Sequence, residues 1–246
     1  MLRAISDLQH YAIHAVDGDL GRVHEFYFDD QQWRVRHIVV TTGGWWPRHR
    51  VLIPTACVVG IAQGRGEVRV TLTRDQVATS PSIDTERPVS RQHEGELYWH
   101  YGFTGIPLPI GLPCGADPHL RRTREVVGYV VHREHERVGD VDDFLVDGAS
   151  WRICCMVVVL AGRCFEKKVL VLPRSILAIS WEARSVHVDL SWAVLRNAPR
   201  YDPGRPIAAD LEAQLHDYYT RVLALPHSSD LEANLESGPA AGRVAA

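Results

Sequence analysis

The sequence has very little lysine and lacks the short motifs of common catalytic and nucleotide-binding sites. Lys167 and Lys168 are its only lysines, and the formal net charge of the 246-residue chain is −3 at pH 7. The chain therefore does not have the strong basic balance typical of nucleic-acid-binding proteins. It contains no G-x-S-x-G, no P-loop and no dinucleotide fingerprint, so no motif predicts nucleophilic catalysis or a nucleotide cofactor.

Disulfide pairs and long apolar runs are also missing. The cysteines form no C-x-x-C pair, and their odd number does not suggest a disulfide framework or a thiolate zinc site. Reduced thiols of this kind predict a cytoplasmic location. The longest apolar run, ICCMVVVLAG at 153–162, is far short of the roughly 20 residues that a membrane span needs. We therefore expect a cytoplasmic protein without direct membrane insertion.

The chain does contain a long internal repeat. Gly139 lies 118 residues after Gly21, and the same separation relates several other identical residues. These further pairs are Phe26 and Phe144, Asp29 and Asp147, and Trp33 and Trp151. The alignment predicts a local slip of one residue where Pro54 matches Pro173. We predict a tandem duplication: a first copy at 1–101, a Pro/Gly linker at 102–119, a second copy at 120–225 and a disordered tail at 226–246.

The residue pattern of each copy predicts a small, strongly bent β-barrel followed by a short helix. Alternating apolar and polar residues between turn signals indicate short strands, and a change of period indicates the helix. The predicted strands of the first copy are 11–16, 21–30, 33–40, 50–54 and 67–72, and the second copy repeats them. The predicted helices are 90–101 and 209–225. The fold class is therefore mainly β, with two small barrels in tandem.

The repeated motifs resemble the PRC-barrel family. The resemblance rests on G-x-V-x-[ED]-F-x-x-D, on W-R-[VI] and on the R/K-V-L-[IV]-x-P block, and it covers nearly all of residues 1–220. It implies an SH3-like β-barrel, present twice. Known members are the cytoplasmic portion of the photosynthetic reaction-centre H subunit and the C-terminal domain of a ribosome maturation factor. The family has no common catalytic residue, and this chain has neither the H subunit's transmembrane helix nor the ribosome factor's N-terminal domain.

Histidines and paired carboxylates are the candidates for metal binding or acid–base chemistry. The clusters are His10 with His14, the segment 132–136 (HREHE), Asp29–Asp30 and Asp142–Asp143. The histidine clusters lack further ligands at the spacing of a closed metal site, and solvated loops explain them better. The acids alternate with apolar residues on strands or lie in turns, where Asp29 and Asp147 are expected to hydrogen-bond their own turn backbone. We predict no catalytic, metal or cofactor-binding residues.

The segment GGWWPRHR contains the candidate interaction surface, which consists of Trp45, Trp46, Arg48, His49 and Arg50. At the repeat separation the tryptophan pair falls on Arg163 and Cys164, so the pair is not a requirement of every copy. Exposed aromatic and arginine side chains are typical of interface hot spots. Replacing both tryptophans by alanine is expected to spare the fold and weaken an interface.

The resulting hypothesis is a non-enzymatic, bacterial adaptor or assembly module with a protein partner. Its most specific form is H-subunit-like association with a membrane or electron-transfer complex. The alternative is an RNA- or ribosome-associated factor. It rests on a basic-aromatic set that could combine charge with base stacking, in which Arg34, Arg36, Arg48, His49 and Arg50 flank Trp33, Trp45 and Trp46. The two copies could pack around a pseudo-twofold axis, form a homo-oligomer or behave as separate beads.

Overall fold

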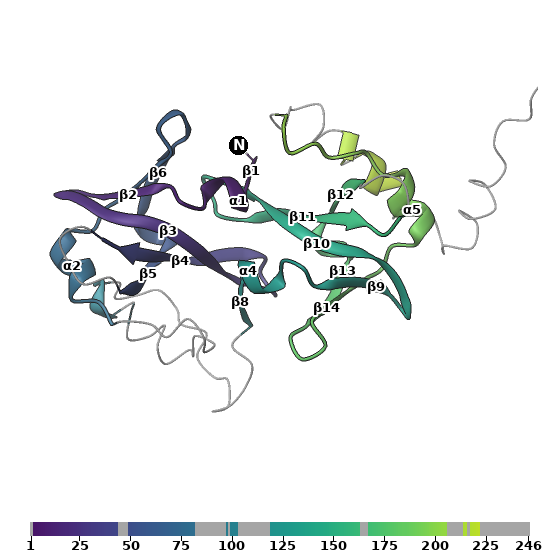
Figure 1. Ribbon diagram of the computed structural model, residues 1–246, viewed down its shortest axis with the longest axis horizontal. Helices are drawn as coiled ribbons and strands as arrows, with labels where there is room; N and C mark the ends of the chain where they lie inside the picture. Colours follow the sequence, from purple (N-terminus) through teal and green to yellow (C-terminus); the bar gives the residue numbers. More distant parts are fainter. Residues whose placement is uncertain are drawn as a thin grey trace, which may run out of the picture. The chain divides into compact units, whose positions relative to one another are not determined.

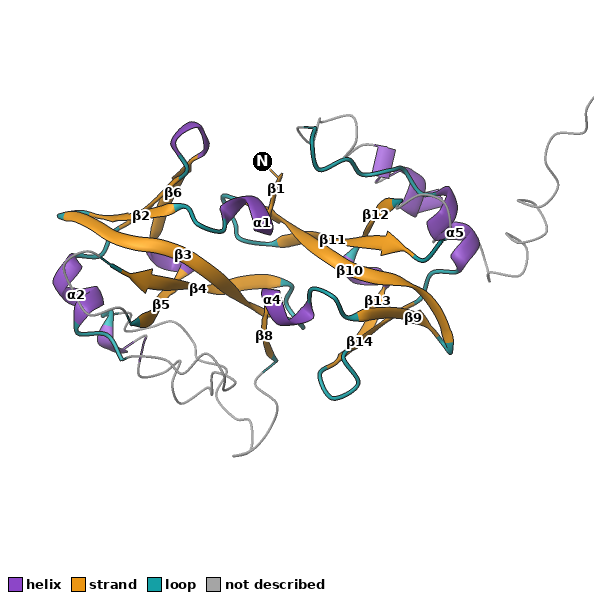
Figure 2. Cartoon of the chain, viewed as in Figure 1, coloured by secondary structure: helices purple, strands orange, loops and turns teal. Residues whose placement is uncertain are grey.

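The computed structural model describes residues 2–43, 49–81, 97, 99–102, 119–162, 167–205, 214–215 and 217–221 (Figure 1). The chain is mainly β, with two sheets and short helices (Figure 2), which confirms the predicted class. The described strands pair in an open order, and their pairing does not close either sheet into a ring. The chain divides into unit 1, Met1–Tyr129 with Asp142–Met156, and unit 2, Val130–Val141 with Val157–Ala246.

The first sheet has the strand order β5-β4-β3-β2-β7-β6, and β8 pairs with β3. Its strands are β2 (Ala12–Ala15), β3 (Gly18–Asp29), β4 (Arg34–Thr42), β5 (Arg50–Pro54), β6 (Val58–Ala62), β7 (Glu67–Val70) and β8 (Leu120–Arg122). The antiparallel β3–β4 hairpin is its longest pairing, and β2 and β7 are parallel. All five strands predicted for the first copy are present, and β6 and β8 are additional.

The second sheet repeats this order as β12-β11-β10-β9-β14-β13, with β1 paired to β10. Its strands are β1 (Leu2–Ala4), β9 (Val130–Arg133), β10 (Glu136–Asp147), β11 (Ile153–Leu160), β12 (Lys168–Val171), β13 (Ile176–Ser180) and β14 (Ser185–Val188). The parallel pair is again present, here between β14 and β9. The two sheets therefore have the same topology, which the internal repeat predicts.

Short helices connect and follow the strands. They are α1 (Ile5–Leu8), η1 (Thr55–Cys57), η2 (Gln63–Arg65), α2 (Arg74–Ala78), α4 (Thr123–Val126), η3 (Pro173–Ser175) and α5 (Trp192–Asn197). Of the two predicted trailing helices, 97, 99–100, 214–215 and 217–221 are described and helical. The rest of those helices, the predicted linker 102–119 apart from its two end residues, and the predicted tail 226–246 lie outside the described residues.

The predicted slip of one residue in the repeat alignment, where Pro54 was matched with Pro173, is wrong. The 3-10 turn η1 begins at Thr55 and η3 begins at Pro173, which keeps the separation of 118 residues. A matching hydrogen bond follows each turn, from Thr71 N to Cys57 O and from Asp189 N to Ser175 O. Proline is tolerated both at the end of a strand and at the first position of a helical turn, so the two prolines occupy neighbouring positions of one structure.

The repeated glycine is required by close strand approach. A Cβ atom on Gly21 would lie 2.1 Å from the carbonyl oxygen of Thr41, and one on Gly139 would lie 2.3 Å from that of Val159. Gly21 also has a φ of 149°. Only glycine lets β3 and β10 bend this closely over the neighbouring strand.

The repeated Asp and Trp form the same turn twice. The Asp29 carboxylate accepts hydrogen bonds from the backbone N–H groups of Gln31 and Gln32 at 2.9 and 2.8 Å, and Asp147 accepts one from Ser150 N at 3.0 Å. This confirms the predicted role of both aspartates. Trp33 and Trp151 follow with φ of 51° and 60°, a left-handed conformation that is rare for a bulky residue.

Tyrosines from the trailing helices attach to each sheet. In unit 1 the buried Tyr101 hydroxyl donates a hydrogen bond to the Leu52 carbonyl oxygen at 3.0 Å. In unit 2 the Tyr219 hydroxyl donates to the Leu170 carbonyl oxygen. Because both residues of this contact recur at the repeat separation, the trailing helical segment is an integral part of each copy.

Unit 1 also contains residues 142–156 of the second copy, and their contacts come in pairs. Val35 N donates to Trp151 O, and Ile153 N donates to Trp33 O, each at 2.8 Å. Arg34 and Arg152 form an antiparallel bridge with each other. Interchanging the repeat positions converts the first hydrogen bond into the second and leaves the Arg34–Arg152 bridge unchanged. The same interchange converts the pairing of β1 with β10 into that of β8 with β3.

Candidate functional site

Only part of the predicted interaction surface falls within the described residues. Trp45, Trp46 and Arg48 lie outside them. His49 is held against Thr42, whose N–H and hydroxyl both donate to the His49 carbonyl oxygen at 3.1 Å. Arg50 begins β5 and is exposed. The assignment of this surface stays a prediction.

Unit 1 has a groove of about 480 Å³ whose lining includes Thr41 and Thr42. Thr41 pairs with Arg50 across the β4–β5 ladder, and Thr42 contacts His49. The polar lining of the groove comes from the turn before β2, from β3 and from the end of β4, namely His10, Asp19, Arg22, His24, Thr41 and Thr42. None of these was a predicted site residue, although His10 was weighed as a metal ligand. The groove brings several cationic or titratable nitrogen groups together.

A β-bulge places His24 in the groove. Val23 pairs with Val40 and Glu25 pairs with Val39, so His24 is the extra residue of β3. A bulge interrupts the alternation of side chains along a strand and is common beside functional sites. Glu25 consequently points inward and is only 4% exposed, whereas His24 remains partly accessible.

His10 is fixed by its backbone. Its φ is 70°, which costs a residue with a side chain roughly 1–2 kcal/mol. Its N–H donates to the Val23 carbonyl oxygen at 2.9 Å, and its own carbonyl oxygen accepts from Arg22 Nη1 at 2.9 Å. The corresponding residue of the second copy is Gly128, with φ of 87°. The first copy therefore keeps a histidine where the backbone favours glycine.

The electrostatic surroundings of the groove are cationic. Burial lowers the pKa of His24 from its ordinary value, and the positive charges of Arg50, Arg124 and His10 lower it further. Arg124 Nη1 lies 3.5 Å from His24 Nε2. Burial raises the pKa of Glu25, while arginines around it act in the opposite direction. A group that carries negative charge would therefore be stabilised beside His24.

The second copy has the opposite charges at the corresponding positions. Asp140 stands where the first copy has Arg22, and Asp142 stands where it has His24. Asp140 forms an ion pair with Arg137 at 2.6 Å. The cationic groove is thus a property of the first copy. The sequence already shows this difference in charge, since 21–25 is GRVHE and 139–143 is GDVDD. It does not reveal the bulge.

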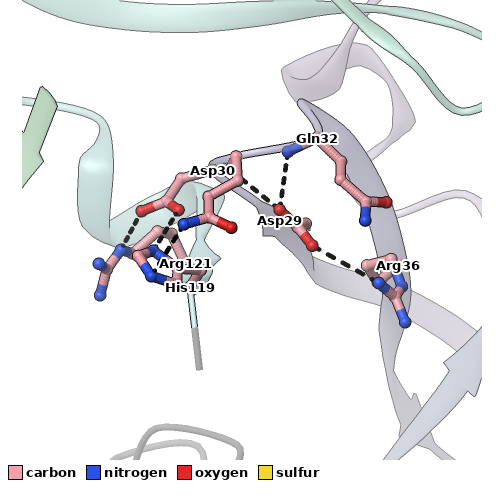
Figure 3. Close-up of polar contacts among 7 residues, drawn as sticks. Asp29, Asp30, Gln32, Arg36, His119 and Arg121 are labelled. Carbon is pink, nitrogen blue, oxygen red and sulfur yellow. Dashed lines mark hydrogen bonds and ion pairs between the residues drawn. The ribbon is translucent and has the colours of Figure 1, made fainter. Parts of the chain in front are cut away.

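The predicted carboxylate pairs have structural partners. Figure 3 shows the Asp30 carboxylate directed toward Arg121 and His119, at 2.7 Å from Arg121 Nε and 3.0 Å from His119 Nδ1. Asp29 is directed away from them, toward Gln32 and Arg36, and its carboxylate is 3.5 Å from Arg36 Nη1. These contacts fix the β3–β4 turn and attach β8 to β3.

The second carboxylate pair, Asp142–Asp143, has a similar role. Asp143 is 8% exposed and accepts a hydrogen bond from the hydroxyl of Ser6 in α1. It also accepts one from the backbone N–H of Phe144 at 2.7 Å. Burial raises the pKa of Asp143, and these donors act against that shift. The carboxylate therefore attaches α1 to the end of β10.

The described residues contain no group of three or more His, Cys, Asp or Glu side chains placed to hold a metal ion. No helix within the described ranges combines the length and the apolar character needed to cross a bilayer.

These features define a mainly β protein whose repeated polar residues serve turns and strand pairing, with a charged groove in one copy. The family comparison identifies the module: residues 2–77 match the family model of the PRC-barrel domain. Residues 2–77 therefore form a PRC-barrel domain, as the motifs indicated, and a domain of this family suggests a protein-interaction or assembly module. The match does not extend to the second copy, whose assignment rests on the internal repeat and the sheet topology. No curated protein matches the chain.

Proposed function

We propose that the chain is a non-enzymatic assembly module that binds a protein partner through its first PRC-barrel. The observation that carries the proposal is the family match at 2–77 together with the charged groove on the same copy. The acids that could have served catalysis instead have defined structural partners, since Asp30 holds Arg121 and Asp143 holds Ser6.

The more specific form of the proposal is association with a membrane or electron-transfer complex, as the resemblance to the reaction-centre H subunit suggests. We place the chain in the cytoplasm, at the surface of such a complex. Complementary charge favours encounter with a partner even when the interface is small.

The alternative of RNA or ribosome association has weaker support. Two arginines that could contact phosphates have other partners, because Arg36 pairs with Asp29 and Arg34 Nε donates to the Ser150 carbonyl oxygen at 3.0 Å. Trp33 packs against Phe28 with ring centroids 5.9 Å apart. Phosphate binding needs several cations together, and Arg34 and Arg36 already contact other groups of the chain.

Native co-migration distinguishes these functions. The tagged chain, expressed in its native cells, is followed through gradients of ribosomes and of gently solubilised membranes, with and without ribonuclease. We expect it to co-migrate with a protein complex of the membrane fraction in a ribonuclease-insensitive manner. Migration with ribosomes that is lost on ribonuclease treatment would support the alternative, and migration as free chain alone would contradict both.

A further inference from the structure

We propose that the groove beside His24 binds an acidic peptide segment, through its Asp or Glu carboxylates, so that it is the partner-recognition site of the first PRC-barrel. This inference rests on the proposed function and names the chemistry of its partner. The groove volume of about 480 Å³ lies within the range of roughly 300–1,000 Å³ typical of ligand sites.

Cationic groups from separate segments converge on this groove. Arg22 and His24 come from β3, and His10 comes from the turn before β2. Arg124 of α4 and Arg50 of β5 add positive charge around His24. Guanidinium groups bind carboxylates through paired hydrogen bonds, which gives both affinity and orientation.

The nearby carboxylates are engaged with other groups. Asp19 lies 2.5 Å from His14 Nδ1, and Glu125 is 3.2 Å from Arg122 Nε. Glu25 is buried, and burial raises the pKa of its carboxyl, which favours the neutral form. An incoming carboxylate would therefore complete the charge balance of the groove.

Carboxylates fit the groove better than a nucleic-acid backbone does. The described lining contains no Phe, Tyr or Trp on which a base could stack. Single-stranded nucleic acids are bound by extended basic grooves with aromatic platforms, which are a different arrangement.

Binding should be coupled to protonation of His24. In the free protein the burial of this imidazole and the neighbouring positive charges favour its neutral form. A bound carboxylate favours the protonated form, so it raises the pKa of His24 in the complex. The affinity should consequently increase as the pH falls through the bound-state pKa. The charged groups around His24, namely Arg50, Arg124 and His10, are present in both states.

The test uses the full chain and a fluorescein-labelled oligoglutamate peptide, with anisotropy as the readout. Arg22→Asp introduces the residue that the second copy has at this position. We expect it to weaken binding at least about tenfold. Arg69→Asp is the matched control, because Arg69 is an exposed arginine on β7 outside the groove and the change in charge is identical. It should leave the affinity nearly unchanged.

A second variant protects the test against a structural effect of Arg22→Asp, since Arg22 also donates to the His10 carbonyl oxygen. His24→Gln removes the titrating group, and we expect it to abolish the increase of affinity at low pH. Equal peptide binding by wild type and Arg22→Asp would overturn the proposal. So would tighter binding of an RNA oligonucleotide of matched charge, or displacement of the peptide by inorganic phosphate at equal concentration.

The two proposals fail separately. If Arg22→Asp still co-migrates with its membrane complex, the assembly function stands and the groove is not its recognition site. If the peptide binds in the groove while the wild-type chain migrates alone, the binding chemistry stands and the assembly function does not.

Discussion

A missing carboxylate in the second copy gives a direct test of the repeat. In the first copy Arg121 Nε donates to Asp30 at 2.7 Å, and both side chains are nearly buried. The corresponding arginine is Arg3, and the residue corresponding to Asp30 is Gly148. The buried Arg3 Nε has no hydrogen-bond acceptor among the described residues. We therefore predict that Gly148→Asp stabilises the protein.

The local geometry permits the substitution. Gly148 does not have a left-handed φ, so a side chain is not strained there. A Cβ atom would lie 3.0 Å from Arg3 Nε and 3.5 Å from Ile61 Cδ1. The close atom belongs to a long arginine side chain, which can move by the few tenths of an ångström required. The carboxylate would then lie where Asp30 lies relative to Arg121.

The expected gain is about 1–2 kcal/mol. Satisfying a buried donor with a charged acceptor contributes roughly 1.5–3 kcal/mol, and replacing glycine at a compatible position contributes about 0.4–1 kcal/mol. Burial of the new carboxylate opposes these contributions. At about 2–4 °C per kcal/mol for a chain of this size, Tm should rise by about 2–8 °C.

Thermal unfolding of the wild type and four variants separates the contributions. Gly148→Ala isolates the backbone effect, and Arg3→Gln with and without Gly148→Asp completes a double-mutant cycle. Arg3 should lower the pKa of the new carboxyl. Its contribution is then fully present above the unfolded pKa near about 4 and is lost as the pH falls through the lower folded value. A gain no larger than that of Gly148→Ala, or an unchanged gain beside Arg3→Gln, would refute the reasoning.

Three further predictions address the first copy. Gly21→Ala should lower the free energy of unfolding in urea by more than about 3 kcal/mol, because the new methyl group would overlap the Thr41 carbonyl oxygen. A loss below about 1 kcal/mol would contradict the close approach of β3 to β4 at this glycine. Tyr101→Phe should cost about 1–2 kcal/mol, because the carbonyl oxygen of Leu52 loses its buried donor, and full stability would exclude that role. Proteolytic cleavage between 103 and 118 should leave the two fragments associated in gel filtration, and release of two independent, stable fragments would support separate beads.

The sequence predicted the strands and turns well because their signals are local. Asp29 and Asp147 marked the turns, since an aspartate in a turn hydrogen-bonds the backbone of its own neighbourhood. The proline slip was wrong for the same reason. Pro54 and Pro173 are each compatible with the same bend at adjacent positions, so residue identity alone gave the wrong register.

The long-range pairings could not be predicted in this way. The segment Leu120–Arg122 has no periodicity long enough to identify it as a strand, and nothing in its composition specifies β3 as its partner. The groove was missed because a bulge at His24 changes which side chains share a face. A period-of-two pattern assumes regular pairing, so one extra residue exchanges the inward and outward sets.

The internal repeat offers a comparison that separates structural from functional positions. Where both copies have the same residue, as at Trp33 and Trp151, the structure gives that residue a backbone role in each. Where the copies differ in charge, as at Arg22 and Asp140, both residues occupy equivalent strand positions, so the fold tolerates either charge. A difference that folding does not require is available for recognition. By this criterion the groove is a candidate recognition site, because its charged residues distinguish the first copy from the second.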